Sequence, residues 1–92
     1  MKAIIKITLK QGVLDPQGKA IETALTRRGF NGIEEVRQGK LIEIMLNEKD
    51  EAKAKAQLVD MCEKLLANMV IENYEIELAM TDNVKNNPAG QA

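Results

Sequence analysis

The sequence predicts an α+β fold, a two-layer sandwich in which two helices cover one face of a mostly antiparallel sheet. Residues 2–10 alternate between apolar and polar side chains, which is typical of a strand with one buried face. Two later stretches, 16–28 and 52–69, repeat apolar residues at three- and four-residue steps, which indicates amphipathic helices. With the remaining strands, the order βαββαβ corresponds to the ferredoxin-like plan.

Residues 12–22, GVLDPQGKAIE, are expected to connect the first strand to the first helix. Asp15 can accept a hydrogen bond from a first-turn amide, and Pro16 suits the first helical position because that nitrogen needs no partner. Gly18 is unusual in a first turn, where glycine costs roughly 0.5–1 kcal/mol relative to alanine, so we expect another backbone to approach it closely. Gly29 can end the helix in the left-handed conformation.

The middle of the chain leaves two arrangements open. Residues 33–37 and 40–46 have the composition of strands and meet at Gln38-Gly39. They form either a hairpin or one long strand that bends at a bulge at Gly39. Two separate strands are favoured.

The second half of the chain is expected to contain a helix and a last strand. Asn47 can cap this helix, which ends near Asn68, and alternation predicts a strand over residues 71–80. These elements complete a single domain over residues 1–80. The polar, aperiodic residues 81–92 are expected to form a flexible tail.

Composition and charge argue against several function classes. The chain has 92 residues, a formal net charge of -1 and 2% aromatic residues, so it lacks the positive charge and the stacking platforms that nucleic-acid binding needs. No apolar run approaches the roughly 20 residues of a membrane span. The sheet face away from the helices would expose aliphatic side chains, which favours self-association. We therefore expect a cytoplasmic homodimer or tetramer with neither nucleic acid nor membrane as a partner.

No catalytic, cofactor-binding or metal-binding residue is expected on this chain. It contains no histidine, and its single cysteine, Cys62, falls in a helical apolar pattern typical of a buried, inert thiol. Residues 12–19 resemble a phosphate loop, but the spacer is one residue too long and Ala20 replaces the hydroxyl that would hold magnesium. Pro16 removes an amide, and Asp15 places negative charge where phosphate would lie. The segment is therefore predicted to start a helix and not to bind a nucleotide.

Three runs carry a family resemblance, in order along the chain: LKQGVLDPQGKAIETALTRRGF, VRQGKLIEIML and MCEKLLANMVIENYEIEL. Together they resemble the small PurS subunit of phosphoribosylformylglycinamidine synthase over about residues 2–79, and GVLDPQGKAI is the most specific piece. The resemblance implies a subunit without catalytic residues of its own in the fourth step of purine biosynthesis. In that step formylglycinamide ribonucleotide becomes an amidine, using ATP and the ammonia released from glutamine.

The same resemblance implies two partner subunits besides a second copy of the chain. A large synthetase subunit, PurL, would hold ATP and magnesium, and a glutaminase subunit, PurQ, would release ammonia. The small subunit would bridge them and support ammonia transfer.

The resemblance does not state which residues contact a partner. We expect the interface among turn and helix-start residues: Asp15, Gln17, Gly18, Arg37, Gly39 and Lys40. Arg37 and Lys40 are expected to face either an anion or the acidic surface of a partner. The alternative function is a dimeric small-molecule sensor, because ferredoxin-like modules often bind effectors at their interfaces.

Overall fold

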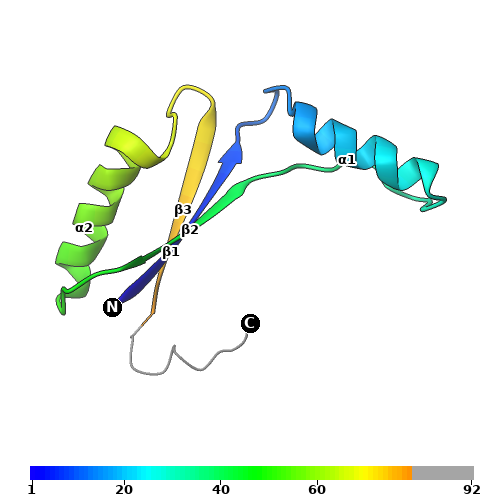
Figure 1. Ribbon diagram of the computed structural model, residues 1–92. Coiled ribbons are helices and arrows are strands. Elements are labelled where there is room, and N and C mark those ends of the chain that lie inside the picture. The colour runs from blue at the N-terminus through cyan, green and yellow to red at the C-terminus, as the bar shows by residue number, and fades with distance from the viewer. Residues whose placement is uncertain (80–92) are drawn as a thin grey trace.

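The computed structural model describes residues 1–79 and confirms the α+β class, with an antiparallel sheet and two helices (Figure 1). Its elements are, in chain order, β1 (Lys2–Leu9), α1 (Pro16–Arg27), β2 (Lys40–Met45), α2 (Glu51–Met61), the π-helical turn η1 (Cys62–Leu66) and β3 (Glu72–Ala79). The strands lie in the order β2-β1-β3, and β1 pairs antiparallel with both neighbours. No helix of the described part is both long and apolar enough to cross a membrane. The predicted tail lies outside the described residues.

The core forms between β1 and the α2–η1 segment. Ile5 and Ile7 of β1 are at most 1% exposed, and Leu58 and Cys62 pack against them without any exposed surface. Side chains from the two flanking strands extend this cluster: Ile42, Ile44, Tyr74, Ile76 and Leu78. The burial alternates along β1, so the half-buried strand predicted from its sequence is confirmed.

The opposite face of the sheet is more polar than the sequence suggested. Lys2 pairs with Glu43 at 3.5 Å, and Lys6 pairs with Glu77 at 2.8 Å. The register places two exposed apolar side chains of β2 on the same face: Leu41 and Met45. Ion pairs therefore interrupt the aliphatic surface expected there.

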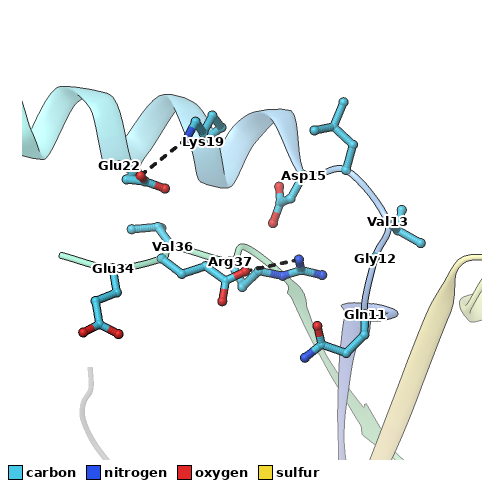
Figure 2. A pocket seen from close by; sticks show the side chains of 11 residues that line it. Gln11, Gly12, Val13, Asp15, Lys19, Glu22, Glu34, Val36 and Arg37 are labelled. Atoms are coloured by element: carbon cyan, nitrogen blue, oxygen red, sulfur yellow. Dashed lines mark hydrogen bonds and ion pairs between the residues drawn. The ribbon is translucent and has the colours of Figure 1, made fainter.

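Residues 33–37 do not form a strand, so the structure contains neither the hairpin nor the long bulged strand, and β2 begins at Lys40. The reason is where the segment lies: residues 33–37 run back beneath α1 (Figure 2), and Asp15 at the start of that helix binds the Gln38 amide just before β2.

α1 projects away from the sheet, so within one chain only α2 covers the sheet (Figure 1). This differs from the expectation that both helices of a chain lie on one face of its own sheet. The contacts that hold α1 in this direction involve the predicted interface residues and are described below.

The second helix begins later than expected, because Asp50 and not Asn47 caps it. Asp50 Oδ1 accepts hydrogen bonds from the amides of Ala52 and Lys53 at 2.9 and 3.2 Å. The helix is regular to Met61 and then continues as η1, closed by the bond from the Ala67 amide to the Cys62 carbonyl.

Candidate functional site: a clamp at the start of α1

Asp15 joins α1 to a segment more than twenty residues away. One carboxylate oxygen accepts the Gly18 amide at 2.9 Å, which caps the helix as predicted. The other accepts the Gln38 amide at 2.8 Å. A single side chain thus begins the helix and fixes residues 33–38, which run back along the helix toward β2. We call these residues the returning segment.

Hydrogen bonding lowers the pKa of Asp15. The largest cause is the Gln38 amide, followed by the Gly18 amide; the positive charge of Arg37 acts in the same direction. Each of these groups favours the carboxylate over the neutral acid. Asp15 is therefore ionised in the folded protein at neutral pH.

Arg37 binds the end of β1 from the same returning segment. Its Nη2 donates to the carbonyls of Leu9 and Lys10, each at 3.2 Å, while Nη1 lies 3.6 Å from Glu35 Oε2. Within this chain the Arg37 guanidinium therefore binds main-chain carbonyls at the end of β1.

Two glycines allow these segments to approach one another. A Cβ on Gly18 would collide with the Val36 carbonyl oxygen, and a Cβ on Gly39 would lie 2.5 Å from the Ile7 carbonyl oxygen. Neither glycine has a positive φ, so close packing and not backbone conformation requires them. The close approach expected at Gly18 is confirmed.

The other two predicted residues lie beside these contacts. Gln17 accepts a hydrogen bond from the Gln38 side chain, and Lys40 lies 3.6 Å from Glu72 of β3. We use the term clamp for the set that holds the start of α1, the end of β1 and the returning segment together: Asp15, Gly18, Arg37 and Gln38. Sequence reasoning missed Gln38, because it contributes a backbone amide to a distant carboxylate.

The clamp separates two open grooves. The larger, of about 600 Å³, lies between α1 and the returning segment and is lined by both acidic and basic side chains (Figure 2): Asp15, Lys19, Glu22, Glu34, Glu35 and Arg37. The smaller, of about 340 Å³, contains Gln17, Gly39 and Lys40. Lys19 pairs with Glu22 at 3.5 Å and Arg37 with Glu35 at 3.6 Å, so both basic side chains that line the larger groove have acidic partners.

The geometry argues against nucleotide binding at residues 12–19, the segment that resembles a phosphate loop. A phosphate at a helix N-terminus is held by free first-turn amides. Here the Gly18 amide already donates to the Asp15 carboxylate, and Pro16 has no backbone N–H to donate. Within residues 1–79 no three histidine, cysteine or acidic side chains gather as a metal site would require.

Cys62 is completely buried in the core, as its helical position predicted. Burial raises the pKa of its thiol, with the Glu63 charge as a smaller cause. Because a nucleophile needs an exposed thiolate and usually a neighbouring base, this thiol packs the core and takes no part in chemistry.

The fold and the clamp define a class of protein: a small α+β subunit in which the clamp residues fix the direction of α1. The PurS family, described as "Phosphoribosylformylglycinamidine (FGAM) synthase", matches residues 2–80. PurS of Methanocaldococcus jannaschii, a phosphoribosylformylglycinamidine synthase subunit, is 47% identical over 77 residues, which cover 84% of this chain and 93% of the relative. The Synechocystis subunit is 50% identical over 74 residues, covering 80% and 74%.

Solved structures agree with this match. The crystal structure of the Methanocaldococcus jannaschii PurS superposes with a TM-score of 0.75 at 49% identity, covering 83% of this chain and 92% of that one. A chain in the Thermotoga maritima PurLQS structure superposes with a TM-score of 0.76 at 32% identity, covering 83% and 93%. The protein belongs to the PurS family, and the comparisons do not favour the small-molecule sensor.

Proposed function

We propose that this chain is the non-catalytic small subunit of a cytoplasmic phosphoribosylformylglycinamidine synthase complex, which makes the amidine using ATP and glutamine. The observation that carries the proposal is the clamp. The most specific family segment, GVLDPQGKAI, fixes the direction of α1, because its Asp15 carboxylate binds two backbone amides. ATP and magnesium belong on the large synthetase subunit in this proposal.

The same chain pairs with a second copy of itself. β2 is an edge strand whose inward side chains, Ile42 and Ile44, remain partly exposed, and the projecting α1 carries Ile21 with 39% of its surface exposed. Burying such surfaces is favourable by roughly 25 cal/mol per Å² of apolar area. If α1 of each copy lies across β2 of the other, each sheet has two helices on one face.

The dimer then bridges the synthetase and glutaminase subunits and supports ammonia transfer between them. A bridge that excludes water has a physical purpose, because ammonia released into water is protonated or lost. Thermotoga maritima PurS occurs in a PurLQS structure, and its similarity to this chain supports the assignment of these partners.

Association of the purified components tests the proposal. The chain, its large synthetase subunit and its glutaminase subunit are mixed with glutamine and magnesium–ADP and analysed by sedimentation velocity. We expect one species that contains all three polypeptides, and a dimer or larger oligomer for the chain alone. Separate sedimentation of the chain under all these conditions would refute the assignment.

A further inference from the structure

The turn Asn31-Gly32 follows α1 and lies outside the clamp. Both residues are exposed and belong to no helix or strand. The last hydrogen bond of the helix end runs from the Phe30 amide to the Leu25 carbonyl at 3.2 Å, and the returning segment starts at residue 33. Asn31 and Gly32 therefore join two held parts of the chain without belonging to either.

The polar groups of this turn have no hydrogen-bond partner within residues 1–79. The Asn31 side chain neither donates nor accepts a bond there, and the Gly32 amide donates to no carbonyl or side chain. Gly32 has a φ of +83°, and a Cβ placed on it would have no atom within 4 Å beyond its chain neighbours. The side-chain amide of Asn31 and the next backbone nitrogen are thus uncovered.

The other asparagines of the described part are held or have bulkier neighbours. Asn68 Oδ1 accepts a main-chain amide at 3.0 Å, and Asn73 Oδ1 accepts a lysine ammonium at 3.1 Å within β3. Asn47 is followed by a glutamate, whose side chain crowds the next backbone nitrogen. Among residues 1–79, Asn31 alone combines an unbonded side chain with a following glycine.

We propose that Asn31 is a site of spontaneous deamidation, because the turn leaves its reacting groups free. The deprotonated Gly32 backbone nitrogen attacks Asn31 Cγ, and this new bond closes a five-membered succinimide. The Cγ–Nδ2 bond breaks, and Nδ2 leaves as ammonia with the proton that the backbone nitrogen lost. Glycine favours this attack because no Cβ obstructs the nitrogen.

Solvent water completes the reaction by opening the ring. Addition at Cγ gives aspartate, and addition at the main-chain carbonyl carbon of Asn31 gives isoaspartate. One amide and one water thus become one carboxylic acid and ammonia, with no change of oxidation state. The chemistry is independent of the proposed function, since it needs only solvent.

Either product changes the end of α1. Each adds a negative charge within four residues of the exposed Arg27 and Arg28. Isoaspartate also adds a methylene to the main chain just before the returning segment, which carries the clamp residues Arg37 and Gln38. Deamidation therefore alters the connection between the helix and the segment that fixes its direction.

Peptide mass spectrometry of the full-length wild type tests the proposal after incubation at physiological temperature and mildly alkaline pH. Among the asparagines of residues 1–79, we expect a gain of about 1 Da, the difference between an amide and an acid, at Asn31 alone. Chromatography should separate aspartate and isoaspartate forms of that peptide. N31Q, whose amide carbon lies one bond farther from the nitrogen, should lose the signal while its circular dichroism matches the wild type.

Met69→Gly is the matched control, because it gives Asn68 the same following residue while the Asn68 Oδ1 bond to the Val70 amide can still form. A hydrogen bond that must open first slows the attack by about tenfold, so Asn68 in the folded variant should react about tenfold more slowly than Asn31. In urea the two sites should react equally. Circular dichroism establishes that the variant is folded in buffer.

Two results overturn the inference. One is an unmodified Asn31 after an incubation that deamidates a synthetic peptide of residues 27–36. The other is an equal rate at Asn68 and Asn31 in folded Met69→Gly, which would show that the unbonded turn does not control the reaction.

Discussion

Gly18→Ala is expected to destabilise the protein, although the same change in an ordinary helix would stabilise it. Alanine is favoured over glycine in a helix by about 0.8–1.0 kcal/mol. At this position the added Cβ would collide with the Val36 carbonyl, a backbone atom that cannot rotate aside. Overpacking of this kind costs about 1–3 kcal/mol. The net effect is a loss of roughly 1 kcal/mol, since returning residues must shift and the Asp15–Gln38 bond weakens with them.

Thermal and urea unfolding at one fixed protein concentration measure this effect, with Thr23→Ala as the matched control. Thr23 is exposed in the same helix, so its replacement should stabilise by a few tenths of a kcal/mol. For a domain of this size, a loss of 1 kcal/mol lowers Tm by about 4–8 °C. A raised Tm for Gly18→Ala, similar to that of Thr23→Ala, would show that Val36 does not constrain this position and that the clamp is described wrongly.

Three further changes test other parts of the structure. Leu58→Ala should destabilise by about 2–5 kcal/mol in urea unfolding, because the side chain is fully buried against β1; a loss below 1 kcal/mol would contradict that packing. Cys62 should resist alkylation by iodoacetamide in the native protein and react on unfolding, because burial both covers the thiol and raises its pKa; rapid native labelling would contradict this. The lowered pKa of Asp15 gives stability that is present above the unfolded carboxyl value of ~3.9 and is lost as pH falls through the folded pKa. The stability difference between wild type and Asp15→Asn should therefore shrink as the pH falls below the unfolded carboxyl value of ~3.9, and a constant difference would contradict the predicted ionisation.

Local interactions were predictable from the sequence. The Asp15–Gly18 bond, Pro16 and Gly29 act within a few residues of their own positions, so the start and the end of α1 follow from capping rules. The alternation of β1 identified its buried face, since burial and side-chain direction share a period of two.

Features that depend on distant partners were not predictable in the same way. Residues 33–37 have strand composition, but they run beneath α1 (Figure 2), and the Gln38 amide that follows them is bound by Asp15 from a distant part of the chain. The glycine at position 18 indicated that another backbone segment approaches closely. It did not indicate that this neighbour is Val36 of the returning segment. Asn47 and Asp50 are chemically similar caps a turn apart, and the structure has Asp50 at the start of the helix.

The clamp also changes how the predicted interface residues are interpreted. Asp15, Gly18 and Arg37 were expected to face a partner, and each makes its described contacts within the chain. We therefore propose that they affect assembly through the direction of α1, on which Ile21 remains partly exposed.

Glutamine-dependent turnover tests the central claim most directly. Amidine formation is measured with the large synthetase and glutaminase subunits, ATP and glutamine, with and without this chain, and ammonium salt replaces glutamine in a parallel reaction. We predict that the chain alone is inactive, that adding it raises the glutamine-dependent rate at least tenfold, and that the ammonium-dependent rate changes much less. Equal glutamine-dependent rates with and without the chain would contradict its role as the bridging subunit.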